Sequence, residues 1–227
     1  MSKNLKFYVD FDGTITQTDV VDRVLERFAD KAWQEVEAEW QSGKIGSREC
    51  LDRQVAFLKT TPEALEAFCA DVKIDAHFID FLKSARELGV PVAVVSDGFE
   101  NVIHPVLKRV LAPYPELLKA LPVYANRIEW AHGRPKASFF SAAVCAHGCA
   151  NCKPEAIRKT AATDDRIVFI GDGLSDRYAA KRSDLTFAKG KLLRYCAEEG
   201  INHLPYQNFG RIEEWLRENA AAAKSSR

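Results

Sequence analysis

Two aspartates separated by one residue, Asp10 and Asp12, follow a short apolar run near the start of the chain. In an extended backbone, side chains two positions apart point to the same side, so both carboxylates face one cavity while Phe11 points away. One carboxylate can attack a phosphorus atom to form an acyl-phosphate, and the other can protonate the leaving alkoxide and later activate water. Mutual repulsion favours keeping one of the two protonated, as a general acid requires.

Three further polar segments supply the donors, the positive charge and the metal ligands that phosphoryl transfer requires. Ser96 is expected at a helix start, where its hydroxyl and the following backbone N–H groups suit a phosphate oxygen. Lys153 stands just before a proline, a pattern typical of a helix N-terminus, and can add a point charge. Asp172 could join Asp10 in binding Mg²⁺, a hard cation that takes oxygen ligands. Asp176 would then orient these ligands without binding the ion itself.

Each of these pieces has an ordinary explanation when it is taken alone. An Asp-Gly pair is most often only a turn, and a lysine before a helix is usually solvated. Their order changes the interpretation, since a carboxylate pair, a serine, a lysine and a second carboxylate pair all fall at predicted strand ends or helix starts. Coincidence is then a poor explanation.

The elements predicted around these residues place them at one edge of a sheet. The short apolar runs 5–11, 90–95 and 167–170 each end in a polar turn that contains glycine. Helical patterns with three-and-four spacing cover residues 76–88, 102–111, 154–161 and 174–182. Alternation of strand and helix predicts an α/β fold, a parallel sheet with helices on both faces. In such folds ligands collect beyond the carboxyl ends of the strands, where all three turns fall.

A helical insertion and a hairpin interrupt this alternation. Four helical patterns occupy about residues 16–73, between the first turn and the second strand. We therefore predict a catalytic core of residues 1–15 and 74–227 and a small helical cap of residues 16–73. Alternating apolar residues over 121–140, with a turn at Gly133-Arg134, are more typical of a β-hairpin than of a helix.

Length and composition restrict the ligands and the compartment. The 227 residues can bury a substantial core, and their 47% hydrophobic content excludes a disordered chain. The 32 Lys and Arg residues balance 32 Asp and Glu residues, which removes the electrostatic argument for a nucleic-acid partner. No apolar run is long enough for a signal sequence or a membrane span. We expect a cytoplasmic protein whose ligand is a small molecule, with neither a nucleic acid nor a membrane as partner.

Three of the six cysteines, Cys145, Cys149 and Cys152, lie within eight positions of the chain. Without a leader sequence, such cysteines indicate reduced thiols or a metal site rather than disulfides. Their spacing suits tetrahedral zinc, and the predicted hairpin could bring His132 over them, so we expect His132 as fourth ligand in preference to His147. Two alternatives stay open: ordinary reduced thiols beside the next helix, or a zinc-dependent interaction module.

Taken in order, the segments DFDGT, VVSDG, CKPEAI and GDGLSD resemble the four motifs of the haloacid-dehalogenase superfamily of phosphatases. The resemblance covers nearly the whole chain and implies a Rossmann-like core that uses Mg²⁺ to hydrolyse a small phosphorylated metabolite. It implies Asp10 as nucleophile and Asp12 as general acid and base. The alternative is a binding protein of the same fold without catalytic activity, which would have to retain all these catalytic groups by accident. The residues that the resemblance implies on the phosphate side are Ser96 and Lys153, and we add Gly13 and Asp97 as candidates there. Those it implies around Mg²⁺ are Asp10, the Asp12 carbonyl and Asp172, and we expect Asp176 to orient these ligands without binding the ion.

The predicted cap resembles that of the phosphoserine-phosphatase branch, particularly over residues 43–58. Where that branch has an arginine for the substrate carboxylate, this chain has Gln54 with Arg53 beside it, and Asp19 could act as an acceptor for the substrate. Closer similarity is to the phosphatases of methionine salvage that act on 2-hydroxy-3-keto-5-methylthiopentenyl-1-phosphate, through DFDGTIT, CAHGCANCKP and NHLPYQ. This resemblance implies that substrate, with phosphoserine or another small metabolite as the alternative.

Asp97 departs from both groups of relatives, which commonly have a glycine after the motif serine. Its charge would repel a phosphate if the side chain turned toward it. We therefore expect the Asp97 carboxylate to point away from the site.

Overall fold

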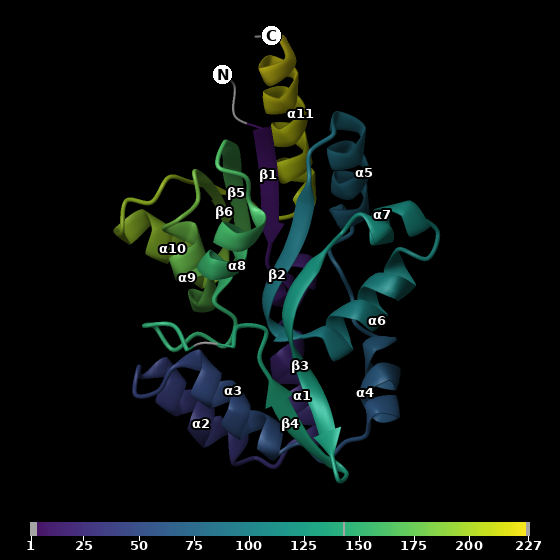
Figure 1. Cartoon of the computed structure of the whole chain (residues 1–227), viewed down its shortest axis with the longest axis vertical. Coiled ribbons are helices and arrows are strands. Elements are labelled where there is room, and N and C mark those ends of the chain that lie inside the picture. The colour runs from purple at the N-terminus through teal and green to yellow at the C-terminus, as the bar shows by residue number, and fades with distance from the viewer. Residues whose placement is uncertain (1–3, 143, 226–227) are drawn as a thin grey trace.

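The computed structural model describes residues 4–142 and 144–225, and Figure 1 shows a central sheet with helices around it. Neighbouring strands pair in parallel, apart from the antiparallel pair β3 and β4. This arrangement confirms the predicted α/β fold. The strand order across the sheet is β4 (Arg134–Ser138), β3 (Val123–Ala131), β2 (Val92–Phe99), β1 (Asn4–Val9), β5 (Asp165–Gly171), β6 (Leu185–Ala188) and β7 (His203–Pro205).

Helix starts follow the capping signals of the sequence. Thr61 caps the helix that Pro62 opens by accepting the N–H of Ala64 at 3.3 Å. No helix among the residues described is long and apolar enough to cross a membrane. The helices are α1 (Val20–Phe28), α2 (Trp33–Gln41), α3 (Ser47–Ala56), α4 (Pro62–Cys69), α5 (Phe78–Leu88), α6 (Glu100–Val110), α7 (Pro115–Lys119), α8 (Lys153–Thr160), α9 (Arg177–Ala180), α10 (Gly190–Glu198) and α11 (Phe209–Ser225).

The central strand β1 is apolar on both faces because helices cover both. Phe7 and Val9 pack into one core with residues of α5 and α11. Tyr8 packs into a second core with residues of α8, α9 and α10. Figure 1 shows these two groups of helices on opposite sides of the strands. The prediction of helices on both faces is confirmed. Strand β1, in the middle of the sheet, ends at Val9, so Asp10 follows its carboxyl end.

Helices α1 to α4 occupy most of the insertion that the sequence predicted as a cap. Helices α2 and α3 pack against each other beyond the carboxyl ends of the strands, while α4 packs against α6 of the core (Figure 1). An antiparallel bridge between Thr16 and Ile74 joins the two ends of the insertion. This bridge supports the proposed division into a core of residues 1–15 and 74–227 and a cap of residues 16–73. Residues 1–3, 143 and 226–227 of that core lie outside the described residues.

The hairpin predicted over residues 121–140 is confirmed as β3 and β4. Its two-residue turn consists of His132 and Gly133, one position earlier than expected, with φ of 50° and 74°. Positive φ at both turn positions matches the twist of a tight hairpin, and glycine adopts it without steric cost. His132 is therefore held at the tip of the hairpin.

Candidate active site

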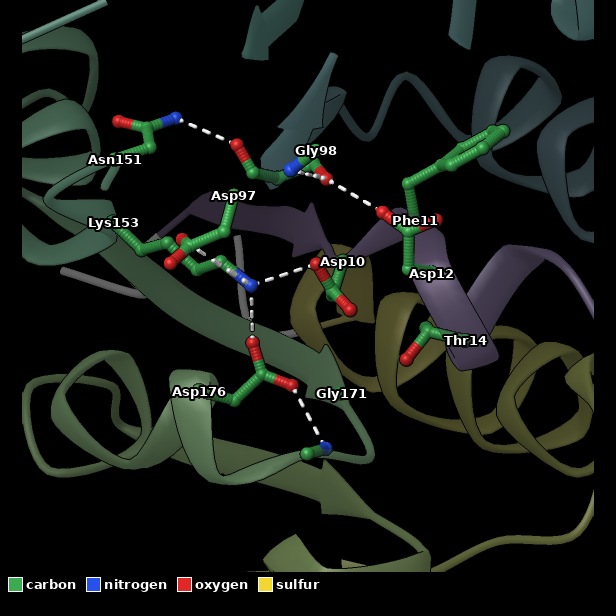
Figure 2. A network of polar contacts seen from close by, with 12 residues as sticks. Asp10, Phe11, Asp12, Thr14, Asp97, Gly98, Asn151, Lys153, Gly171 and Asp176 are labelled. Carbon is green, nitrogen blue, oxygen red and sulfur yellow. Dashed lines mark hydrogen bonds and ion pairs between the residues drawn. The ribbon is translucent and has the colours of Figure 1, made fainter. Parts of the chain in front are cut away.

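Asp10 lies at the centre of a buried polar cluster where three segments of the chain meet (Figure 2). Its Oδ1 is 2.7 Å from Nζ of Lys153, the first residue of α8. The same ammonium group lies 2.5 Å from Oδ1 of Asp176, in the segment after β5. Burial and the charge of Asp176 raise the pKa of Asp10, and the Lys153 ammonium opposes this rise. A bound cation would favour the ionised, nucleophilic form further.

Lys153 remains charged in this setting. Its side chain is only 1% exposed. Burial alone would lower its pKa, but the surrounding carboxylates, Asp10 foremost, raise the pKa of Lys153 well above its usual range. The ammonium group is therefore a fixed positive charge, of the kind that can hold a phosphoryl oxygen beside Asp10.

Asp12 is positioned by two donors from different elements. Its Oδ2 accepts a hydrogen bond from the Ser96 hydroxyl at 3.3 Å, and its Oδ1 accepts one from the Val20 N–H, in the first turn of α1, at 3.1 Å. Burial raises the pKa of Asp12 to about 8, and the charge of Asp19 adds to the rise. A carboxyl group with this pKa can carry a proton near neutral pH, as a general acid must. The sequence argument ascribed this to repulsion from Asp10, whereas burial is the larger cause.

Ser96 lies in an irregular part of strand β2. The expectation of a helix start at Ser96 is therefore wrong. Strand β2 continues to Phe99 and α6 begins only at Glu100. The pairing of β2 with β3 shifts register between Val95 and Phe99, which allows residues 96–98 to turn toward the site. The N–H of Gly98 donates to the Ser96 hydroxyl at 2.9 Å, and a Cβ on Gly98 would lie 2.5 Å from Asp12 Oδ2.

Carboxylate oxygens of Asp10, Asp172 and Asp176 lie within 4.8 Å of one another. The Thr14 hydroxyl donates to Asp172 Oδ1 at 3.2 Å, and a Cβ on Gly13, whose φ is 69°, would lie 2.6 Å from Asp172 Oδ2. Burial, followed by the charge of Asp176, raises the pKa of Asp172 to about 6. A surplus of clustered carboxylates with hard oxygen atoms fits a magnesium ion.

Asp176 uses both carboxylate oxygens to organise this cluster. Its Oδ2 accepts the N–H groups of Asp172 at 3.0 Å and Gly173 at 3.2 Å, while its Oδ1 accepts the Lys153 ammonium. The side chain is fully buried. These contacts suit the orienting role expected for it, because they fix both the loop that carries Asp172 and the position of Lys153.

The Asp97 carboxylate points toward the site, which corrects the expectation from the sequence. Its Oδ1 lies 4.0 Å from Lys153 Nζ (Figure 2). Its Oδ2 accepts a hydrogen bond from the Ser47 hydroxyl at 3.3 Å. The attraction of the buried ammonium and the hydroxyl of α3 explain this orientation. Burial raises the pKa of Asp97 to about 6, and the charge of Lys153 opposes the rise.

The cap residues predicted to touch the substrate are placed differently from one another. Arg53 turns to carboxylates of the cap, with Glu39 at 2.6 Å and Glu49 at 3.5 Å, and its side chain is 40% exposed. These ion pairs engage Arg53 within the cap, and its contact with the substrate stays a prediction. Asp19 caps α1 by accepting the N–H of Asp22 at 3.0 Å, and its charge reaches Asp12.

The cysteine cluster forms with a different histidine from the one expected. Ligand atoms of Cys145, His147 and Cys149 lie within 4.8 Å of one another, whereas His132 is exposed at the hairpin tip. The preference for His132 is therefore wrong. The tight turn fixes His132 at the end of two paired strands, and the loop around Gly148, with φ of 61°, brings in His147 locally.

Three residues that contribute to the site were not singled out from the sequence. Thr14 could have been found, because it continues the alternation that places Asp10 and Asp12 on one side. Ser47 gave no local signal, and neither did Asn151, whose amide donates to the carbonyls of Ser96 at 3.0 Å and Tyr124 at 2.8 Å. Their roles depend on segments that are distant in sequence.

Comparison with known proteins adds independent evidence. A model of the family described as haloacid dehalogenase-like hydrolase matches residues 7–181. A Bacillus velezensis protein named 2-hydroxy-3-keto-5-methylthiopentenyl-1-phosphate phosphatase is 31% identical, and the match covers 100% of both chains. A Geobacillus kaustophilus protein of the same name is 29% identical, over 92% of this chain and 94% of its own length.

Similarity also extends to solved structures of phosphoserine phosphatase. One holds an analogue of the phospho-aspartyl intermediate, and it matches 94% of this chain and 99% of its own with a TM-score of 0.70 at 20% identity. A substrate-bound complex matches 95% of this chain and 99% of its own, also with a TM-score of 0.70 at 20% identity. At this level of identity the similarity is one of fold.

Proposed function

The chain belongs to the haloacid dehalogenase-like hydrolase family and is a phosphatase, and on that premise we propose that Asp10 is its nucleophile and 2-hydroxy-3-keto-5-methylthiopentenyl-1-phosphate its substrate. Phosphatases related to it act on small phosphorylated metabolites. The observation that carries the substrate is the match over all or nearly all of the chain to proteins named for it, at 31% and 29% identity. The placement of Asp10 beside Lys153 and Asp12 supports the chemistry.

In the first half of the reaction an Asp10 carboxylate oxygen attacks the phosphorus atom. The new bond joins phosphorus to Asp10, and the bond from phosphorus to the substrate oxygen breaks. Asp12, whose raised pKa allows it to hold a proton, gives that proton to the leaving oxygen. Lys153, 2.7 Å from Asp10, can bind a phosphoryl oxygen while this happens.

In the second half the aspartyl-phosphate on Asp10 is hydrolysed. Asp12 is now ionised and takes a proton from a water molecule, whose oxygen attacks phosphorus. The bond between phosphorus and Asp10 breaks, inorganic phosphate leaves, and both carboxyl groups return to their starting states. Hydrogen bonds from Ser96 and Val20 hold Asp12 in reach of both the leaving oxygen and the water.

Magnesium is the ion that phosphatases of this family generally use. The residues proposed to hold it here are Asp10, the backbone carbonyl of Asp12 and Asp172. When bound, the ion neutralises charge on the phosphoryl oxygens. Asp176 and Thr14 support this set by fixing Asp172 through its N–H and its carboxylate. The thiols of residues 145–152 take no part in these steps.

The cap supports a substrate without a free carboxylate. Gln54 is buried and its amide donates to Glu37 at 3.0 Å, and Arg53 is engaged by Glu39. Glu37 and Asp19 add negative charge, and burial, with a contribution from the charge of Glu37, raises the pKa of Asp19. Recognition of a carboxylate calls for a paired cation such as arginine, whereas a ketone or hydroxyl can be bound by neutral or acidic groups.

The test is to measure kcat/KM for the enol phosphate and for L-phosphoserine side by side, in a wider panel of phosphorylated metabolites. We expect the enol phosphate to be hydrolysed much faster at low concentration, and the Asp10→Asn protein, prepared in parallel, gives the contaminant background. A wide margin in favour of phosphoserine would discard the proposed substrate and leave the phosphatase chemistry standing. Activity equal to the Asp10→Asn background on every compound would overturn the proposed nucleophile.

A further inference from the structure

We propose that the loop before α8 binds one zinc ion through Cys145, His147, Cys149 and Cys152, separately from the magnesium site. The ligand atoms of the first three residues lie within 4.8 Å of one another. Cys152 lies near enough to Cys145 for each thiol to influence the pKa of the other, and it is the nearest further cysteine along the chain. The N–H of Cys149 also donates to the Cys145 sulfur at 3.3 Å, which satisfies a sulfur that would carry negative charge in a metal site.

The geometry and the chemistry of this set match zinc. Zn²⁺ prefers four sulfur and nitrogen ligands in a tetrahedron, and with Zn–S bonds of about 2.3 Å two sulfur ligands lie about 3.8 Å apart. A cluster already drawn within 4.8 Å reaches this geometry by a small inward movement. Three thiolates and one neutral imidazole form a common structural zinc set, and the thiol protons leave to solvent on binding.

Regular secondary structure and apolar burial contribute little to the shape of this loop. The described residues of the segment 139–152, which connects β4 to α8, form neither helix nor strand, and this segment is long for a connection in a compact domain. Two of its large apolar side chains face solvent, Phe140 at 44% and Val144 at 67% exposure. Burial of apolar surface therefore contributes less here than in the two cores, and a metal can supply the missing cross-link.

This loop connects the cap to the catalytic lysine, which gives the metal a role. The carbonyl of Gly148 accepts the N–H of Arg48 in α3 at 2.9 Å, and the N–H of Ala150 donates to the Ser47 hydroxyl at 2.9 Å. Cys152 immediately precedes Lys153. A zinc ion at this point would hold the loop that contacts the start of α3 and precedes α8. We call this the bracing role of the zinc ion, because it would stabilise the position of the cap over the site.

The first experiment measures bound metal. The protein is purified without chelator, incubated with Zn²⁺ in the presence of excess Mg²⁺, passed through gel filtration and analysed for zinc. We expect about one zinc per chain. Cys145→Ala and Cys149→Ala should lose it, whereas Cys196→Ala, which removes a buried thiol from α10, is the matched control and should retain it. Cobalt in place of zinc should give the intense thiolate charge-transfer absorption of a tetrahedral site in the wild type and in Cys196→Ala only.

Three results would overturn the site. They are no zinc retained by the wild type, a loss of zinc in Cys196→Ala equal to that in Cys145→Ala and Cys149→Ala, or peptide mass spectra that show a disulfide within residues 145–152 in protein purified with a reducing agent. A second measurement needs no variant and so does not depend on their folding. A zinc-selective chelator, added at constant Mg²⁺, should accelerate hydrogen exchange at the amides of Arg48 and Cys149 by about tenfold or more and leave the amides of β1 unchanged. Unchanged exchange at both amides would refute the bracing role.

Discussion

At the scale of single residues, the position of Asp10 supports the proposal that it, among several carboxylates, is the nucleophile. It directly follows the central strand β1, and Lys153 Nζ lies 2.7 Å from its Oδ1. We expect Asp10→Asn to lower kcat by at least about a thousandfold, because the amide has nearly the same shape but is a poor nucleophile. The measurement is steady-state hydrolysis of an aryl phosphate, with thermal unfolding as the control for an intact fold. Substantial activity in a well-folded variant would contradict the mechanism.

Asp12 offers a sharper test because its contribution depends on the leaving group. Asp12→Asn removes the acid and should lower kcat for an alkyl phosphate by about 10²–10⁴-fold. An aryl phosphate needs less protonation of its leaving oxygen, so its loss should be clearly smaller. Rates on both substrates for both proteins decide the matter, and equal losses would contradict the acid role.

Thr14 tests the magnesium site without removing a proposed ligand. Its hydroxyl donates to Asp172 at 3.2 Å, so Thr14→Val should raise the Mg²⁺ concentration needed for half-maximal activity by about tenfold. Thr186→Val is the matched control, because Thr186 is buried in β6 and its hydroxyl has no hydrogen-bond partner among the described residues. A Mg²⁺ titration of activity compares the two variants. The same Mg²⁺ requirement in both would remove Thr14 from the site.

At the scale of elements, helix α3 carries two residues with opposite expectations. Ser47 touches Asp97 and the N–H of Ala150, so Ser47→Ala should raise KM several-fold by loosening the contact between cap and core. Arg53 lies on the same helix and pairs with Glu39 of α2. It should be replaceable by alanine with less than about a twofold change in kcat/KM, because exposed ion pairs contribute little.

Kinetics of both variants on the enol phosphate and on L-phosphoserine test this pair of expectations. The substrate comparison matters because an arginine that bound a substrate carboxylate would affect phosphoserine selectively. A large and selective loss of phosphoserine hydrolysis in Arg53→Ala would identify Arg53 as a substrate ligand.

At the scale of the whole molecule, α11 closes one face of the sheet. Its first residue, Phe209, is fully buried, with ring centroids 5.0 Å from Phe78 and 5.3 Å from Phe81. Phe209→Ala should lower the free energy of unfolding by about 3–5 kcal/mol through lost burial and a cavity. Phe140→Ala is the control, with a loss of about 1 kcal/mol or less, since that ring is 44% exposed. Urea unfolding gives both values, and similar losses would place α11 outside the cooperative core.

The sequence alone determined the fold class and the order of the chemical groups. The apolar run before Asp10 predicted a strand covered on both faces, and the packing of Phe7 and Tyr8 into separate cores agrees with it. Local patterns succeed here because apolar periodicity and turn residues act over a few positions. Strand β6, the edge strand β7 and helices α10 and α11 were not singled out. Their patterns are short or weak, and their burial depends on neighbours that are distant in sequence.

Only the tertiary structure decided how side chains turn within the site. The sequence placed Asp97 away from the phosphate and His132 over the cysteines, yet Asp97 faces Lys153 and His147 joins the cluster. Both outcomes depend on contacts across the chain: a buried ammonium group from α8, a hydroxyl from α3 and a tight hairpin turn. The type of a residue determines which chemistry it can perform. The orientation of its side chain and its pKa depend on partners and burial that exist only after the chain has folded.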